Sequence, residues 1–148
     1  MKANTPMNLA LACALALAGC AKSPITTAEL VGGPMLEMRQ AVDRNVADPS
    51  RQTQLLALVG ELDGVLQAHS RDLNTLSGDL SRLNADYDAT REAFDTLASA
   101  FAQRSQVRKE RALDLHFQMV ALTSVEEWSP ISKREVEALS GARTPLKN

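Results

Sequence analysis

The sequence predicts an all-α protein: a long antiparallel, coiled-coil-like helical hairpin braced by short N- and C-terminal helices. First, no proline occurs between Ser50 and Leu122. Second, apolar residues recur through this span at alternating spacings of four and three, which is typical of helix-on-helix packing. Third, turn- and cap-forming residues gather at positions 84–88, the midpoint of the span.

The first residues have the order of a bacterial secretion signal. Lys2 is followed by an apolar core, Met7 to Leu17, that is too short to cross a bilayer, which needs about 20 residues. The core closes on Leu17-Ala18-Gly19-Cys20, which resembles the lipobox of bacterial lipoproteins at all four positions. The resemblance implies lipid on Cys20 and cleavage before it, so that residues 1–19 are a signal peptide. The alternative is an ordinary signal with a chance cysteine.

This resemblance also implies where in the cell the protein is located. Ala21 stands where an aspartate would retain such a protein in the inner membrane, which favours the outer membrane, facing the periplasm. Because Cys13 leaves with the signal and Cys20 takes lipid, no thiol remains for a disulfide, and the fold must rest on apolar packing. With 16 Lys and Arg against 18 Asp and Glu, neither charge dominates, and no nucleic-acid partner is expected.

Residues 20–34 are expected to form the lipidated tether. The breakers in Val31-Gly32-Gly33-Pro34 predict a loop there. A first short helix is expected from Met35 to about Ala47, with one apolar face made of Met35, Met38, Val42 and Val46. Pro49 or Ser50 can then open the first long arm.

The two arms of the expected hairpin, Ser50–Asn84 and Asp88–Leu122, are 35 residues each. One continuous helix of about 105 Å is the alternative, because the apolar phase runs through the midpoint. The hairpin is favoured because it brings the wide apolar stripes at the outer ends of both arms together. The seam consists of Leu55, Val59, Leu62, Leu66, His69, Leu73, Leu76, Leu80, Leu83, Tyr87, Thr90, Phe94, Leu97 and Phe101.

Pairing about the midpoint sets position i opposite roughly 172 − i, which places Arg111 against Glu61 and Lys109 against Asp63. The acidic face of the first arm would then balance a basic cluster of Arg104, Arg108, Lys109 and Arg111. Exposed pairs of this kind contribute only about 0–1 kcal/mol each.

After the second arm, Thr123-Ser124-Val125-Glu126 predicts a capping box with Thr123 as the cap. A short last helix follows, with an interruption near Ser129-Pro130 and an end at Gly141. The hairpin domain is therefore expected over residues 35–140, with a loose tail over 141–148.

One stretch carries a second resemblance. An arm with Arg104, Arg108, Arg111 and His116 ends in Leu122-Thr123, and Glu126-Glu127-Trp128 and a short helix follow. Residues 86–128 thereby resemble the closing half of the Spy/CpxP group of small periplasmic helical proteins. The chain departs from the group at Glu127-Trp128, where a glutamine is usual, and it lacks the earlier second Leu-Thr motif. The resemblance implies chaperone or stress-sensing activity, although a shared fold does not establish a shared function.

No catalytic or cofactor-binding motif is present in the sequence, so no enzyme activity and no cofactor are expected. His116 and Met119, spaced i and i+3 on one helical face, are weak candidates for a soft metal site. His69 lies at a seam position and is expected to be a packed polar residue. The heptad-spaced Asp72, Asp79 and Asp86 are expected to form a solvated flank.

These observations favour a non-catalytic periplasmic lipoprotein, anchored through Cys20, whose hairpin is a binding or scaffold module for a protein partner. One alternative is a Spy-like chaperone or metal-responsive sensor. Another is an oligomeric coiled-coil spacer.

Overall fold

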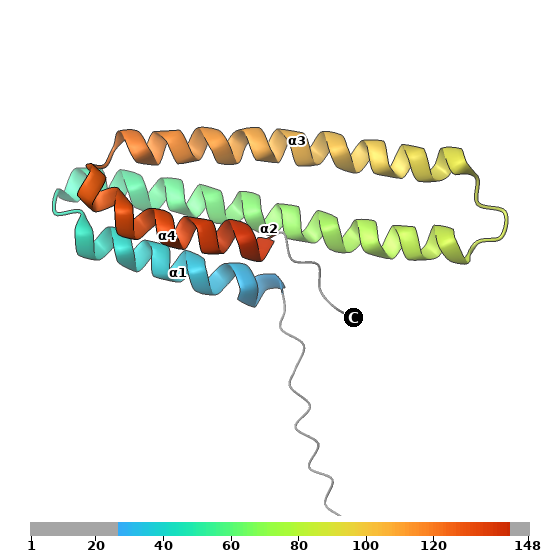
Figure 1. Cartoon of the computed structure of the whole chain (residues 1–148), viewed down its shortest axis with the longest axis horizontal. Coiled ribbons are helices and arrows are strands. Elements are labelled where there is room, and N and C mark those ends of the chain that lie inside the picture. Colours follow the sequence, from blue (N-terminus) through green and yellow to red (C-terminus); the bar gives the residue numbers. More distant parts are fainter. Residues whose placement is uncertain (1–26, 143–148) are drawn as a thin grey trace, which may run out of the picture.

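The computed structural model describes residues 27–142, and this part of the chain is all-helical, with no strand. The fold is the expected long helical hairpin with two shorter helices packed on it (Figure 1). The expected signal peptide, the lipobox with Cys20, and the tail beyond Ala142 lie outside the described residues. The four helices are α1 (Thr27–Asn45), α2 (Pro49–Ala85), α3 (Arg91–Ala121) and α4 (Val125–Ala142).

The turn between α2 and α3 confirms the hairpin and excludes the continuous rod. Asp86 caps the end of α2, and its carboxylate accepts a hydrogen bond of 3.0 Å from the amide of Asp88. Thr90 then caps α3 by accepting from the amide of Ala93. At the end of α2 the backbone amide of Asp86 donates to the carbonyl of Leu83, and the side chain of Asp86 holds the turn. At the start of α3 the side chain of Thr90 satisfies a free amide, as its cap preference predicts.

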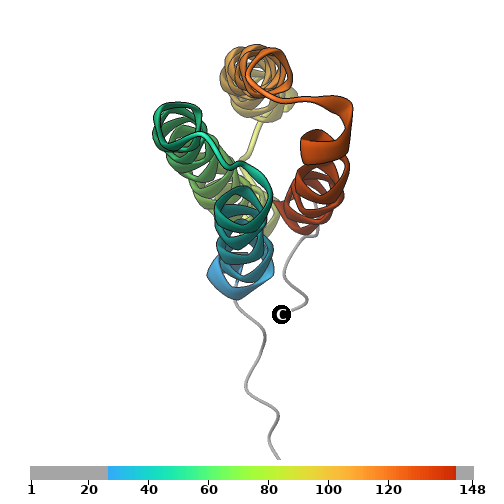
Figure 2. The same ribbon diagram turned by 90° about the vertical axis from the view of Figure 1, so that its left-hand side faces the viewer.

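The hairpin has two parts, which we call the base and the arm. In the base, α1 and α4 pack on one half of α2 and α3, so that four helices surround one core (Figures 1 and 2). The arm, residues 68–103, is the other half, which α1 and α4 do not reach. Since α2 has 37 residues and α1 has 19, their lengths are about 55 Å and 28 Å, and the arm extends about 27 Å beyond the base.

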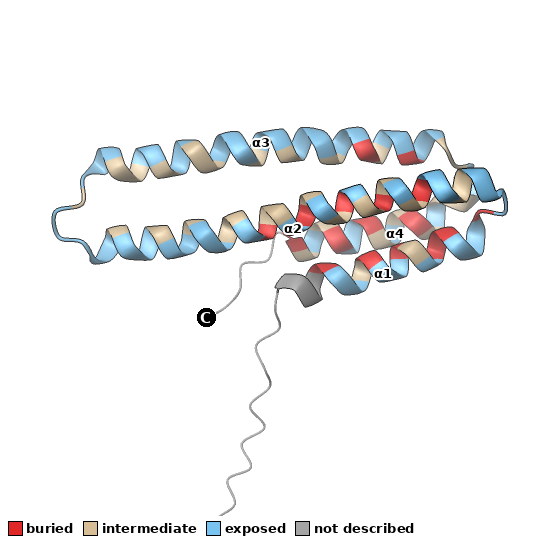
Figure 3. Cartoon of the chain, turned by 180° about the vertical axis from the view of Figure 1, so that it is seen from behind, coloured by how far each residue is buried: buried red, intermediate tan, exposed pale blue. Residues whose placement is uncertain are grey.

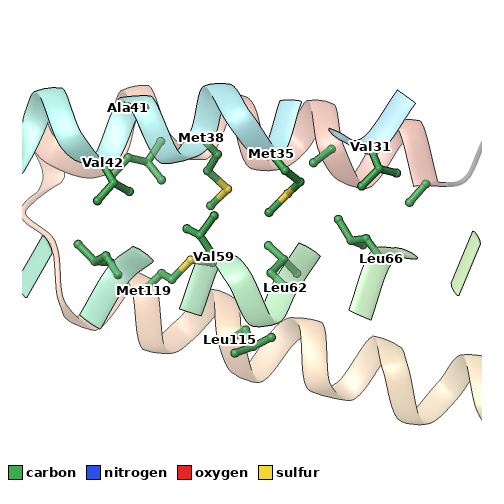
Figure 4. Close-up of a cluster of buried hydrophobic side chains, with 14 of the residues drawn as sticks. Val31, Met35, Met38, Ala41, Val42, Val59, Leu62, Leu66, Leu115 and Met119 are labelled. Atoms are coloured by element: carbon green, nitrogen blue, oxygen red, sulfur yellow. The ribbon is translucent and has the colours of Figure 1, made fainter. Parts of the chain in front are cut away.

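The core of the base is aliphatic and rich in methionine. Met35 and Met38 of α1 face Val59 and Leu62 of α2 and Met119 of α3 (Figure 4). All five are at most 1% exposed. The buried apolar residues are Val31, Met35, Met38, Ala41, Val42, Val46, Leu55, Val59, Leu62, Leu66, Leu115, Met119, Ile131, Ala138 and Ala142.

The expected loop at Val31–Pro34 is wrong, because α1 runs through it from Thr27. Val31 is 1% exposed and continues the apolar face of Met35 and Met38, while Gly32 and Gly33 are exposed. Burial of this face against α2 and α4 outweighs the local cost of Pro34, about 3 kcal/mol in a helix interior.

The expected interruption of the last helix at Ser129-Pro130 is wrong for the same kind of reason. Pro130 lies in the second turn of an unbroken α4, which continues past Gly141 to Ala142. Ile131, Ala138 and Ala142 on its inner face are all at most 2% exposed. Tertiary packing again decides the extent of the helix.

The capping box before α4 is shifted by one residue. Thr123 donates its hydroxyl to the carbonyls of Met119 and Val120, and so belongs to the end of α3. Ser124 is the cap instead: its hydroxyl accepts from the amide of Glu127, and the carboxylate of Glu127 accepts from the amide of Ser124. The predicted Thr123–Glu126 pair is therefore wrong, although the motif itself is present.

Candidate interaction surface

The arm keeps its apolar seam but does not bury it. No residue between Ser70 and Leu115 is buried, although seven leucines and phenylalanines of the seam lie in this stretch (Figure 3). Leu80 is 37% exposed and Tyr87, at the tip, is fully exposed. The half-buried members are Leu73, Leu76, Leu83, Phe94, Leu97 and Phe101.

The same spacing that buries α2 in the base continues into the arm. Leu55, Val59, Leu62 and Leu66 are at most 5% exposed because α1 and α4 cover them. Beyond Leu66 the repeat of three and four persists, so the arm presents the same face of α2 without those two helices. The arm is thus an open, two-helix continuation of a four-helix bundle.

His69 and Ser70 mark the junction between base and arm. The imidazole of His69 contacts the ring of Phe101 across the hairpin, with centroids 6.1 Å apart. This contact confirms His69 as a packed seam residue. Ser70 is 5% exposed, and its hydroxyl makes no hydrogen bond within the described part of the chain.

At this junction, Asp72 of α2 binds two arginines of α3. Its carboxylate lies 2.9 Å from Nε of Arg104 and 2.6 Å from Nη1 of Arg108. Partial burial raises the pKa of Asp72, but hydrogen bonds and charge from Arg104 and Arg108 outweigh burial and leave the pKa below its ordinary value. This carboxylate stays ionised at neutral pH and fixes the register of the arm.

In the base, one of the two predicted cross-hairpin pairs forms. Arg111 pairs with Glu61, whose hydrogen bond raises the pKa of Arg111 against the opposing effect of burial. The predicted pair of Lys109 with Asp63 is wrong, since Asp63 binds Arg39 of α1 at 3.1 Å. The pairing rule did not include α1, which competes for the flank of α2.

His116 and Met119, the candidate metal ligands, face different surroundings. Met119 is fully buried among the core methionines. His116 lies at the α3–α4 border, where its Nδ1 is 2.8 Å from a carboxylate oxygen of Glu135 and its ring contacts Trp128 edge-on. No group of three or more His, Cys, Asp or Glu side chains placed to hold a metal ion occurs among residues 31–142.

The buried Glu135 was not recognised from the sequence. It is 3% exposed, and its spacing of four from Ile131 and three from Ala138 places it on the apolar face of α4. A carboxylate at such a position needs a polar partner, and His116 supplies it. The α4 periodicity could have identified this residue.

The heptad-spaced aspartates do not form a carboxylate pair. Asp72 binds Arg104 and Arg108, Asp79 binds Arg82 one turn away, and Asp86 caps α2. Each aspartate therefore has a structural partner of its own.

A smaller apolar stripe lies on the outside of the base. Leu113, Phe117 and Val120 of α3 are 48%, 65% and 37% exposed and occupy one helical face. Unlike the arm, this stripe continues no buried seam.

None of the described helices is both long and apolar enough to cross a membrane. Comparison of the chain with protein-family profiles, with curated proteins and with solved structures finds no match.

Proposed function

We propose that this chain is a lipid-anchored lipoprotein of the bacterial envelope that acts as a non-catalytic helical binding module, and that its arm is the surface that contacts a protein partner. The observation that carries the proposal is the abrupt change in burial along one seam. Leucines at the same heptad positions are buried in the base and only partly buried in the arm. A continuous apolar stripe that no described part of the chain covers is a typical protein-binding surface.

The proposed membrane location rests on Leu17-Ala18-Gly19-Cys20, in which Cys20 would carry the lipid. The test is fractionation of cells that express the full chain and its Cys20→Ser variant. We expect the wild-type chain in the membrane fraction and the variant, uncleaved or released, with altered mobility on a gel. A variant that is cleaved normally and stays membrane-bound would overturn the lipid anchor.

The role of the arm is tested by photocrosslinking in cells that express the full chain. A photoreactive phenylalanine analogue replaces Leu80 on the arm or Leu36 on the outside of α1, which is 57% exposed. We expect a discrete adduct of higher mass from position 80 and none from position 36. Equal adduct patterns at both positions, or no adduct at position 80, would overturn the arm as the contact surface.

A second function, a chaperone like the Spy/CpxP group, draws support from the mixture of apolar and charged side chains along the arm. Asp72, Arg104 and Arg108 flank half-exposed leucines there. The test is aggregation of a reduced model client with and without the protein. Suppression by the wild-type chain that a Leu76→Ser, Leu80→Ser variant loses would support this function, and no suppression would exclude it.

A further inference from the structure

We propose that the arm binds the arm of a second copy of this chain, side by side and with the tips pointing in opposite directions. This inference rests on the proposed function, in which the arm is the contact surface, and it names the partner. Two arms placed in this way form a two-plus-two helical bundle between the four-helix bases of both copies. The result is one continuous four-helix bundle along the whole dimer.

Length is the first argument. The arm extends about 27 Å beyond the base, and it offers the same length of uncovered α2 and α3 to its partner. In the base, α1 and α4 cover this face with helices of 19 and 18 residues. The arm of a second copy supplies two helices to the face of α2 and α3 that no described helix covers, until its tip meets the ends of α1 and α4.

Charge is the second argument, and it selects the antiparallel orientation. The tip, residues 79–95, carries five acidic residues (Asp79, Asp86, Asp88, Glu92 and Asp95) and two basic ones (Arg82 and Arg91). The junction region, residues 67–78 and 96–110, spans the last turns of the base and the first turns of the arm around His69 and Ser70. It carries four basic residues, of which Arg71 lies on the arm and Arg104, Arg108 and Lys109 on the adjoining base, and two acidic ones (Asp72 and Glu110). Opposite directions bring each acidic tip to a basic junction, whereas parallel arms would place like charges together.

Ion pairs within one copy do not exhaust these charges. At the tip, Arg82 and Arg91 bind Asp79 and Asp95 on their own helices. Asp88 takes part in no ion pair within the described part of the chain, and at the junction the same holds for Arg71. Asp88 at the tip and Arg71 at the junction therefore carry charges that no ion pair among the described residues neutralises.

Symmetry makes this dimer compatible with anchoring of both copies in one membrane. The two-fold axis crosses the arms at mid-length, and it places α2 beside the partner's α2 and α3 beside the partner's α3. Because α1 packs on α2, both α1 helices lie on the same edge of the dimer. Both α1 helices therefore begin, at Thr27, on that edge.

The size of the contact predicts a dimer that needs the membrane. Two helices about 10 Å wide and 27 Å long give roughly 500 Å² on each copy and roughly 1,000 Å² in total, the lower limit for a specific interface. Confinement of both copies to one surface raises their effective concentration. We therefore expect more dimer on membranes than in detergent at the same amount of protein.

The test is thiol crosslinking of the full chain in membranes, with a bifunctional maleimide about 10 Å long. Leu76→Cys lies at mid-arm next to the two-fold axis, Tyr87→Cys at the tip, and Ala47→Cys at the far end of the base. We expect a dimer band from Leu76→Cys alone. The unmodified chain is the control for Cys20, and Ser77→Cys repeats the mid-arm measurement in case Leu76→Cys folds poorly.

Linkage through Tyr87→Cys would overturn the antiparallel orientation, because tips in opposite directions lie about 27 Å apart. Equal linkage at all three positions would indicate random collision and overturn the interface. No linkage at Leu76→Cys or Ser77→Cys would overturn the second copy as partner. A photoadduct of position 80 with a different protein would then leave the proposed function intact.

A charge swap tests the electrostatic argument separately. Asp88→Lys reverses a charge at the tip without removing the backbone contact of Asp88 to Asp86, and we expect it to lower the Leu76→Cys dimer severalfold. Adding Arg71→Glu restores opposite charges between tip and junction and should restore the dimer. Asp43→Lys makes the same charge reversal at an exposed position of α1 and is the matched control. It should not change the amount of Leu76→Cys dimer. Failure of the rescue would overturn the antiparallel pairing.

Discussion

Arg51 and Glu127 form a two-pronged ion pair although 76 residues separate them along the chain. The guanidinium of Arg51 donates to both carboxylate oxygens of Glu127, at 2.7 and 3.0 Å, and also to the carbonyl of Leu122 at 3.1 Å. One side chain thus joins the start of α2, the end of α3 and the start of α4. Such a planar, two-bond geometry is stronger and more directional than a single contact.

Replacement of Glu127 by glutamine should lower the melting temperature by several degrees. The change removes the charge that Arg51 binds and weakens the acceptor of the Ser124 amide. Glu126→Gln is the matched control, because the carboxylate of Glu126 accepts from the hydroxyl of Ser124 and from its own backbone amide but forms no ion pair within the described residues. Thermal unfolding followed by circular dichroism measures both. Equal shifts for the two variants would contradict a special role for the Arg51 pair.

The contribution of Glu127 should disappear in acid. The hydrogen bond from Arg51 is the largest cause that lowers the pKa of Glu127, and the Ser124 amide adds to it. A lowered folded-state pKa gives stability that is present above the unfolded value of about 4.3 and is lost as pH falls through the folded value. The melting temperatures of wild type and Glu127→Gln should therefore differ at pH 7 and converge as the pH falls below the folded-state pKa of Glu127. A constant difference would contradict this account.

Truncation of one leucine should have very different effects in the base and in the arm. Leu62→Ala empties a fully buried position and should destabilise the protein by about 2–5 kcal/mol. Leu80→Ala, the same change at a 37% exposed position of the same helix, should cost less than about 1 kcal/mol. Urea unfolding of dilute protein in detergent measures both. Similar losses would show that the arm is covered under those conditions.

Substitution of Gly64 by alanine should stabilise the protein by about 0.5–1 kcal/mol. Gly64 lies in the middle of α2, and a methyl group built there meets no atom within 4 Å. Alanine restricts the unfolded chain and favours the helix at no steric cost. Ala57→Gly, at an exposed position of the same helix, should lose a similar amount. A loss of stability on Gly64→Ala would instead reveal a contact outside the single chain.

Amide hydrogen exchange should divide α2 at the junction. Amides in the buried segment from Leu55 to Leu66 should exchange only on global unfolding. Those from Leu73 to Leu83, on the half-exposed arm, should exchange faster in dilute protein. Uniform protection along the whole helix would contradict an uncovered arm.

Sequence periodicity predicted the hairpin well, because heptad spacing and cap residues act locally. In the turn, the Asp86 side chain accepts from the amide of Asp88 and the Thr90 side chain caps α3, which are roles that short polar side chains favour. Local rules were wrong at Pro34 and Pro130, where burial of a whole helix face outweighs one helix-breaking residue.

The candidate surface could be predicted only in part. The seam is visible in the spacing of its leucines, but its change from buried to half exposed depends on where α1 and α4 stop. That boundary follows from the start of α1 at Thr27, which the glycines and Pro34 concealed. The Asp63–Arg39 and Arg51–Glu127 pairs could not be predicted either, because they depend on the packing of separate helices.

The start of α1 at Thr27 also sets how the molecule can orient on a bilayer. Thr27 lies level with the middle of the hairpin, so a lipid on Cys20 would attach the hairpin to the membrane near the middle of its length (Figure 1). Six residues lie between Cys20 and Thr27, and the seven steps from one to the other span at most about 25 Å. Even upright, the tip would rise only about 50 Å above the headgroups. A protein attached in this way would be too short to span the periplasm, and it would reach only partners close to the membrane surface.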